Sequence, residues 1–289
     1  MIVAILNPKG GSGKSTLSTN FARAMQLRGH PVLIVDTDTQ GTMRDWQAMQ
    51  DDHSDMPPVI GVDPKRMETD LGRLSMAYDV VVVDGTAKMM QGLGHTVKIA
   101  DMVLIPVQPS GADLWAVSAL AELIRTRQQI FNGLPKTAFV VSRQIQGSKL
   151  ASEIDAALAE FELPVLKTRL SQRVIYAGAL SQGLTVLDLE PEGKAADEVR
   201  NLTNEIVDVF GDTYQKALEM RRIRIESKGM FNDAYEHALE GDHREIGESL
   251  PKHDEAAHKG SVGDRGARDP YQHLIASGFA PPIQSTDLP

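Results

Sequence analysis

Lys9-Gly10-Gly11-Ser12-Gly13-Lys14-Ser15-Thr16 closely follows the apolar run Ile2-Val3-Ala4-Ile5-Leu6, and this order decides the fold of the chain. A strand that leads through a glycine-rich turn into a helix directs several backbone N–H groups at one point, with the positive end of the helix dipole behind them. Glycines let the backbone close around phosphate oxygens and take positive φ where the turn requires it. The stretch therefore predicts a phosphate-binding loop, in preference to a chance glycine-rich turn.

Two lysines occur in this loop. Lys14 stands where its ammonium reaches the β- and γ-phosphates of a nucleotide, and the Ser15 hydroxyl stands where it ligates Mg²⁺. The usual pattern accepts any residue at the position of Lys9, so a second lysine there is a departure. The loop predicts binding of ATP and Mg²⁺ and raises the question of what Lys9 does.

The bulk composition fits a globular protein. The chain has 289 residues, of which 42% are hydrophobic, and it contains no cysteine, which excludes disulfides and iron–sulfur clusters. No run of 18 apolar residues occurs and the N-terminus enters a strand at once, so we expect a cytoplasmic protein without a signal peptide. The net charge is −9, and residues 226–289 carry 12 acids against 6 Lys and Arg. A local basic surface elsewhere thus remains compatible with the overall charge.

Apolar runs alternate with amphipathic stretches over some 200 residues. Continuous apolar runs are typical of strands buried on both faces of a parallel sheet. The sequence places such runs at 2–6, 31–35, 80–83, 102–105 and 138–141, and helical patterns at 16–28, 65–76, 89–99, 113–131 and 148–161. This alternation predicts an α/β fold with a doubly wound, mostly parallel sheet. Together with the phosphate-binding loop, it predicts a fold of the P-loop NTPase type.

Acidic residues stand at the ends of two of these runs. Asp36 and Asp38 follow the second run, and Asp84 follows four valines. Ligands of such folds bind at the carboxyl ends of the strands, so we expect these carboxylates near Lys14. Asp84 can hold a Mg²⁺-bound water opposite Ser15. One of Asp36 and Asp38 can organise the Mg²⁺ shell while the other orients an attacking water; helix capping and turn formation are the alternative roles for these aspartates.

The C-terminal third differs from the rest in composition. An amphipathic pattern over 194–210 ends at Gly211, a weaker helical pattern follows, and Gly, Pro, His and charged residues dominate from Gly241 onward. We predict an ATPase domain over 1–211, a helical extension over 212–240 and a disordered polar tail over 241–289.

Several motifs together resemble one protein family. The loop with Lys9 is similar to the deviant Walker A loop of the ParA/MinD ATPases, and Val35-Asp36-Thr37-Asp38-Thr39-Gln40-Gly41 is similar to their second motif. Further likeness to the short ParF-like ParA partition proteins is spread over other segments: Leu6-Asn7-Pro8, Asp84-Gly85, Ile105 to Ser110, and Ser171-Gln172-Arg173 with Tyr176. The resemblance covers about residues 1–210. Relatives often place prolines after the third-motif aspartate, where this chain has Gly85-Thr86-Ala87-Lys88.

The resemblance implies roles for single residues. Lys9 would reach across an ATP-bound homodimer to the phosphates of the partner. Asp38 would position the hydrolytic water, and Asp84 would be the Walker B carboxylate. Nucleotide contacts would come from the loop and the second motif: Gly10, Gly11, Ser12, Gly13, Lys14, Ser15, Thr16 and Asp36. The metal would be held by Ser15, Asp36 and Asp84.

The resemblance also implies partners. Partition ATPases bind DNA non-specifically through its phosphates, and Lys167, Arg169 and Arg173 are the candidate contacts in this sequence. We therefore expect a nucleoid-associated protein that segregates plasmid or chromosome DNA together with a small centromere-binding adaptor. Two alternatives stay open: a ParA-like ATPase that positions a protein cargo or promotes conjugative DNA transfer, and a MinD-like membrane-cycling ATPase. Residues 279–289 lack the pattern of an amphipathic membrane helix, so we expect no stable membrane association.

Overall fold

The computed structural model describes residues 1–245 with the exception of 39–40, 52, 64–65, 86–89, 146 and 148. Within this part, six strands form one sheet in the order β3-β2-β4-β1-β5-β6, and every neighbouring pair is parallel. The strands are β1 (Ile2–Ile5), β2 (Val32–Asp36), β3 (Val59–Gly61), β4 (Val80–Asp84), β5 (Met102–Val107) and β6 (Lys136–Val141). The predicted α/β class with a parallel sheet is confirmed.

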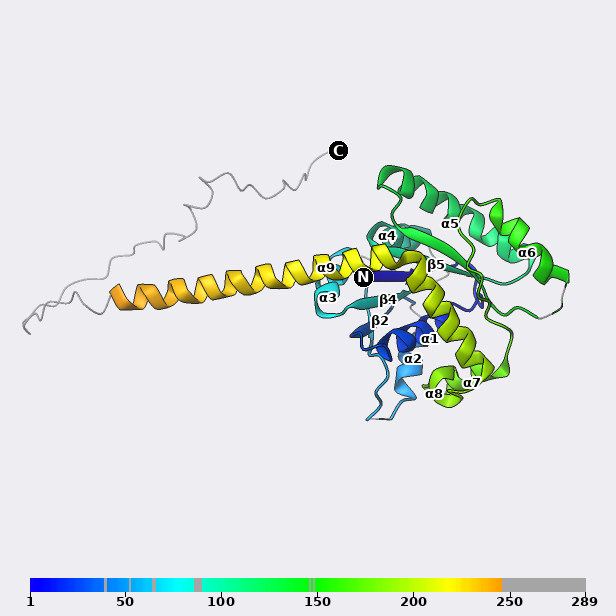
Figure 1. Cartoon of the computed structure of the whole chain (residues 1–289), viewed down its shortest axis with the longest axis horizontal. Coiled ribbons are helices and arrows are strands. Elements are labelled where there is room, and N and C mark those ends of the chain that lie inside the picture. Colours follow the sequence, from blue (N-terminus) through cyan, green and yellow to red (C-terminus); the bar gives the residue numbers. More distant parts are fainter. Residues whose placement is uncertain are drawn as a thin grey trace, which may run out of the picture. The chain divides into compact units, whose positions relative to one another are not determined.

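Helices cover both faces of this sheet (Figure 1). One face carries α3 (Met67–Ala77), α4 (Met90–Ile99), α5 (Gly111–Ile130) and α6 (Lys149–Ala159). The other face carries α1 (Lys14–Gln26), α2 (Thr42–Ala48), α7 (Val174–Ser181), α8 (Val186–Leu189) and the first part of α9 (Lys194–Glu245). Each strand is followed by a helix that crosses back over the sheet, as a doubly wound arrangement requires.

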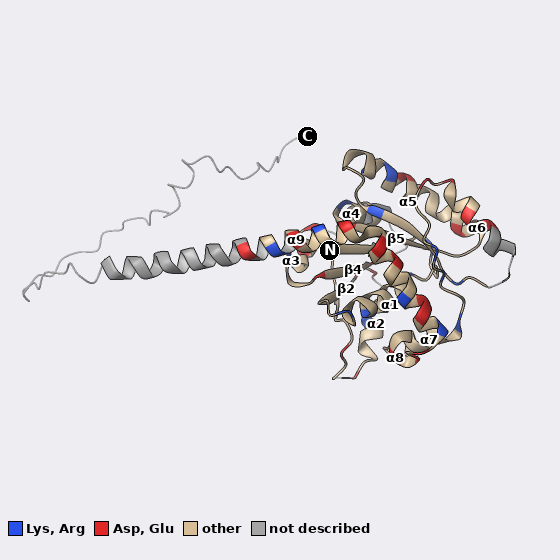
Figure 2. Cartoon of the chain, in the orientation of Figure 1, with Lys and Arg blue, Asp and Glu red and all other residues tan. Residues whose placement is uncertain are grey.

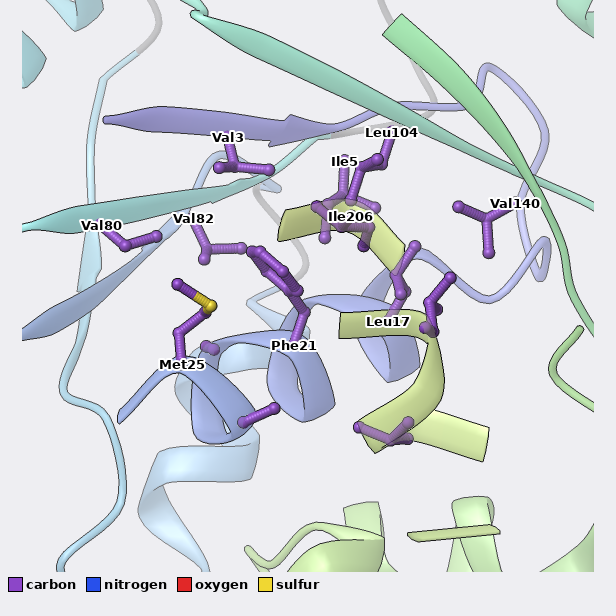
Figure 3. Close-up of a cluster of buried hydrophobic side chains, with 14 of the residues drawn as sticks. Val3, Ile5, Leu17, Phe21, Met25, Val80, Val82, Leu104, Val140 and Ile206 are labelled. Atoms are coloured by element: carbon purple, nitrogen blue, oxygen red, sulfur yellow. The ribbon is translucent and has the colours of Figure 1, made fainter. Parts of the chain in front are cut away.

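The valine run of β4 shows how the sequence builds two cores. Successive strand residues point to opposite faces, so Val80 and Val82 join the core under α1, while Val81 and Val83 join the core under α3, α4 and α5. Figure 3 shows the first core, where Phe21 of α1 and Ile206 of α9 pack with the strand residues. Both faces of β4 are fully buried, which explains why its apolar run is unbroken.

The last helix departs from its predicted end. Gly211 does not terminate it, and α9 instead shows one non-helical residue, Phe210, at φ −115° and ψ 15°. Beyond this kink the Tyr214 hydroxyl hydrogen-bonds the imidazole of His30, and the two rings meet edge to face. The predicted boundary at residue 211 thus falls inside a helix, and the division into 1–211 and 212–240 stays a proposal.

The chain divides into two compact units, Met1–Tyr235 and Glu236–Pro289. Of the second unit, residues 236–245 are described and are helical. The predicted disorder concerns 241–289, and from residue 246 onward that prediction lies outside the described residues.

The register of the sheet determines where the site forms. Asp36 lies beside Asp84, and Asp84 lies beside Ile5, the last residue of β1. The carboxyl ends of β1, β2 and β4 therefore meet at one edge, immediately below the loop that enters α1.

Candidate active site

The loop between β1 and α1 uses its glycines where the backbone demands them. Gly11 has φ +73° and Gly13 has φ +95°, a region that side chains disfavour. A Cβ at Gly13 would also lie 3.3 Å from Ser142 Oγ, whereas Gly10 has open space around it. Gly13 is the N-cap of α1 and Lys14 its first residue, so the positive end of the helix faces the loop.

A cavity of about 990 Å³ opens beside this loop. Among the described residues that line it are most of the predicted site residues: Gly10, Gly11, Gly13, Lys14, Ser15, Thr16, Asp38 and Asp84. Lys9, Ser12 and Asp36 are not in the lining. The Ser12 carbonyl accepts a hydrogen bond from Ser142 Oγ at 2.7 Å, which joins the loop to the end of β6.

Lys14 is held at the centre of the loop. Its ammonium donates to the carbonyl oxygen of Lys9 at 2.9 Å, and the residue is 9% exposed. Burial lowers the pKa of Lys14, while the nearby carboxylates of Asp84 and Asp38 act in the opposite direction. With one backbone carbonyl as its hydrogen-bond partner among the described residues, this buried ammonium retains donors for the oxygens of a phosphate.

Two serine hydroxyl groups of α1 donate hydrogen bonds to the carboxylate of Asp84. Ser15 Oγ donates to Oδ2 at 3.0 Å and Ser18 Oγ donates to Oδ1 at 2.7 Å. Burial raises the pKa of Asp84 to about 6, against the opposing effects of these serines and of Lys14. A serine hydroxyl and a carboxylate that converge in this way fit a Mg²⁺ ion, which takes oxygen ligands and favours the ionised carboxylate. Ser18 was missed from the sequence, although its spacing of three from Ser15 puts both on one helix face.

The pKa of Asp84 makes stability depend on pH. The folded protein holds this proton up to about pH 6, whereas the unfolded chain loses it near pH 4, so stability falls as pH rises between these values. We expect Asp84→Asn to stabilise the nucleotide-free protein by about 3 kcal/mol at pH 8 and by about half of that at pH 5. Thermal melts over this pH range measure the difference, with Asp51→Asn, an exposed aspartate, as the control. An equal advantage at both pH values would contradict the assignment.

Asp36 organises the turn that presents Asp38. Its Oδ1 accepts from the backbone N–H of Asp38 at 2.8 Å, and its Oδ2 accepts from the backbone N–H of Arg44 at 3.4 Å and from Arg44 Nε at 3.5 Å. Arg44 also donates to the Asp38 carbonyl at 3.1 Å. Both carboxylate oxygens of Asp36 are thus engaged within the turn. This favours a shaping role for Asp36, and its predicted contact with Mg²⁺ stays a prediction.

The Lys9 side chain pairs with an acidic residue that is not in the described lining of the cavity. Its Nζ lies 2.6 Å from Oδ2 of Asp113, the third residue of α5. Its backbone N–H donates to Asn7 Oδ1 at 2.7 Å. The contact between Lys9 and Asp113 joins residues 104 positions apart, and the sequence pattern did not indicate it.

Further residues of the cavity lining come from two segments, and one of these residues is Arg173, a predicted DNA contact. Ser142 to Ile145 follow β6, Leu170 to Arg173 precede α7, and Val174, Tyr176 and Ala177 lie in its first turn. Tyr176 is 8% exposed, and its hydroxyl donates to Glu198 of α9 at 3.0 Å. Burial and the Glu198 carboxylate raise the pKa of Tyr176. Glu198 also accepts from the backbone N–H of Ser171 at 3.1 Å, so α9 holds this part of the lining in place.

The predicted DNA contacts carry acidic partners. Arg173 donates to Glu198 at 2.7 Å, and this hydrogen bond is the main cause of its raised pKa. Arg169 pairs with Asp155, and the backbone N–H of Lys167 donates to Glu205 at 2.6 Å. Basic and acidic residues lie interspersed along the first part of α9 (Figure 2). DNA phosphates would have to replace the carboxylates paired with Arg169 and Arg173, whereas the bond of Lys167 to Glu205 comes from its backbone. DNA binding by the three residues stays a prediction.

Only the first residue of the segment Gly85-Thr86-Ala87-Lys88, which follows Asp84, lies within the described residues. Gly85 packs so tightly that a Cβ there would lie 2.3 Å from Leu6 Cδ2 and 3.1 Å from the Ile5 carbonyl. Residues 86–89, including Lys88, lie outside the described part of the chain. The glycine that follows Asp84 is therefore required for β4 to end against β1.

Comparisons with known proteins give one matching family, a nucleotide-binding domain, and several similar proteins. The CobQ/CobB/MinD/ParA nucleotide-binding domain matches residues 3–186. The chain is 32% identical over 208 residues to "Maintenance of carboxysome distribution protein A" of Halothiobacillus neapolitanus, which covers 71% of this chain and 95% of that protein. It is 26% identical over 238 residues to "Chromosome-partitioning ATPase Soj" of Thermus thermophilus, with 71% and 94% covered.

A solved structure shows the same fold. The septum site-determining protein MinD of Pyrococcus horikoshii, complexed with Mg-ADP, superposes with a TM-score of 0.59 at 18% identity, over 73% of this chain and 98% of that one. With the phosphate loop, the paired serine and aspartate and the parallel sheet in place, the chain belongs to the CobQ/CobB/MinD/ParA family and is a P-loop ATPase of the ParA/MinD type.

Proposed function

We propose that this ATPase binds ATP with Mg²⁺, dimerises in that state and separates after hydrolysis. The supporting observation is the position of Lys9. This lysine belongs to the phosphate loop, yet its ammonium contacts Asp113 and is absent from the described lining of its own cavity. A loop lysine that does not line its own cavity supports a role toward the nucleotide of a second copy.

Different residues of the cavity bind the phosphates, hold the metal ion and orient the attacking water. Lys14 and the loop N–H groups bind the phosphates, with Thr16 at the inner end of the loop. Ser15 and Asp84 hold Mg²⁺, which when bound spreads the negative charge of the β- and γ-phosphates. Asp38 lines the same cavity and orients the water that attacks the γ-phosphorus, releasing ADP and phosphate.

We further propose that the ATP-bound dimer binds DNA non-specifically and spreads over the nucleoid. Lys167, Arg169 and Arg173 are the proposed contacts, and a second copy doubles their number on one assembly. Counterion release makes such binding strongly salt-dependent. The expected cargo is plasmid or chromosome DNA, held through a small centromere-binding adaptor, as the similarity to a chromosome-partitioning ATPase supports.

A second candidate cargo is a protein assembly. The relative with 32% identity is named for the maintenance of carboxysome distribution, which supports positioning of a protein cargo by the same cycle. Promotion of conjugative DNA transfer is a further form of this alternative. A membrane-cycling role of the MinD kind is the remaining alternative. In the described part of the chain, no helix is both long and apolar enough to cross a bilayer.

The testing experiment measures binding to random-sequence duplex DNA with ATP, ADP or no nucleotide across a salt series. We expect binding with ATP alone, and an affinity that falls steeply with salt. Lys167→Ala is expected to weaken binding equally for all sequences and to lower the slope of log affinity against log salt by about 1. Equal binding in all three nucleotide states would contradict the proposal.

A further inference from the structure

Asp113 is a buried carboxylate beside the phosphate loop. The residue is fully buried, with 1% of its side chain exposed, whereas 37% of the Lys9 side chain is exposed. Lys9 Nζ and Ser110 Oγ both donate to Oδ2 of Asp113. Its other oxygen, Oδ1, is buried without a hydrogen-bond partner among the described residues.

This environment makes the carboxylate depend on Lys9. A buried charge is costly unless a counter-charge and hydrogen bonds compensate it. Around Asp113 the hydrogen bonds come from Ser110, which also caps α5, and the compensating cation is Lys9. Removal of the ammonium would leave the buried carboxylate with only the Ser110 hydroxyl and the positive end of the α5 dipole as compensation among the described groups.

Lys9 is also joined to the phosphate site through its backbone. Lys14 Nζ donates to the Lys9 carbonyl at 2.9 Å, and the Lys9 N–H donates to Asn7 at 2.7 Å. Phosphate oxygens compete for the ammonium of Lys14, because a charge-assisted hydrogen bond is stronger than one to a neutral carbonyl. Nucleotide binding therefore weakens one of the contacts that hold Lys9 in its present position.

We propose that Asp113 is a positioning residue for Lys9, which retains the lysine in the single chain and makes dimerisation depend on the charge of the triphosphate. To reach the phosphates of a second copy, Lys9 must leave Asp113, and the cost of that separation must be met by the new contact. ATP offers more negative charge than ADP, so the retained lysine favours ATP. This inference rests on the proposed dimer cycle.

The test is a double-mutant cycle with wild type, Asp113→Asn, Lys9→Ala and the combined variant, and with Glu122→Gln as the control that removes an exposed acid from the same helix. Without nucleotide, we expect Lys9→Ala to lower the melting temperature and Asp113→Asn to restore most of that loss in the Lys9→Ala background. With a non-hydrolysable ATP analogue, we expect Asp113→Asn to lower the concentration for half-maximal dimerisation about tenfold. It should also produce a measurable dimer with ADP.

The outcomes separate this inference from the proposed function. Additive melting shifts, or unchanged dimerisation of Asp113→Asn, would overturn the role of Asp113. An effect of Asp113→Asn on dimerisation that persists in the Lys9→Ala background would also overturn it, because the carboxylate would then act without the lysine. A wild-type chain that stays monomeric with the ATP analogue would overturn the dimer cycle itself, and the melting shifts would still decide whether Lys9 and Asp113 are coupled.

Discussion

Replacing Lys14 with alanine is expected to weaken ATP binding about 100-fold and to abolish ATP-dependent dimerisation. The ammonium of Lys14 is buried in the loop and bonds a single carbonyl, so it is the cation preorganised for the phosphates. Hydrogen bonds to charged groups contribute about 1.5–3 kcal/mol each, which corresponds to a loss of about ten- to more than a hundredfold. Titration calorimetry with ATP measures the affinity, and light scattering after size-exclusion chromatography measures the dimer.

The variant should remain folded, because the removal of a partly desolvated ammonium takes no apolar side chain from the core. A thermal melt checks this. Lys9→Ala is the matched comparison, since it removes the other loop lysine and is expected to keep ATP affinity in the single chain while losing the dimer. Dimers of Lys14→Ala that persist with ATP would show that the loop does not control assembly.

Replacing Asp38 with alanine is expected to lower turnover at least 100-fold while ATP binding remains, so that the ATP-bound dimer accumulates. Asp38 lies in the cavity lining on a turn held by Asp36 and Arg44. A residue that orients the attacking water typically contributes about 10²- to 10⁴-fold. Phosphate release measures turnover, and sedimentation with ATP and Mg²⁺ measures the trapped dimer.

Asp45→Asn serves as the control, because Asp45 is an exposed acid on the following helix, α2. It should leave both turnover and dimerisation at wild-type values. Normal turnover in Asp38→Ala would remove Asp38 from the mechanism, and loss of ATP affinity would assign it to nucleotide binding instead.

Much of the fold could be predicted because buried parallel strands are long apolar runs. The runs at 80–83 and 102–105 are strands β4 and β5, and the helical patterns at 65–76 and 148–161 are α3 and α6 within two residues at each end. The three-residue edge strand β3 and the seven-residue helix α2 were missed. They are too short for a periodic pattern to rise above chance.

Only those residues of the site that belong to a sequence motif could be predicted. Strand ends meet at one edge of the sheet, which brought Lys14, Ser15, Asp38 and Asp84 together as expected. The contacts of Lys9 with Asp113 and of Tyr176 with Glu198 join residues 104 and 22 positions apart. They depend on how the helices pack against the sheet, and the patterns of a single sequence carry no information about that packing. Arg44 is close in sequence to Asp36 and Asp38, its partners, but no pattern distinguishes it from a solvated cation on a short helix.

The carboxylates on α9 indicate how much of the chain is needed to form the whole site. Glu198 holds Ser171 and Arg173, and Glu205 accepts the backbone N–H groups of Lys167 and Thr168 at 2.6 and 2.7 Å. The matched family domain stops at residue 186, before either glutamate. A truncated protein with that end point would retain every phosphate-binding group and lose the hydrogen bonds that fix one side of the nucleotide cavity. We therefore expect a self-sufficient ATPase to reach past the kink at Phe210 to Tyr214, where the helix makes a partly buried contact with His30.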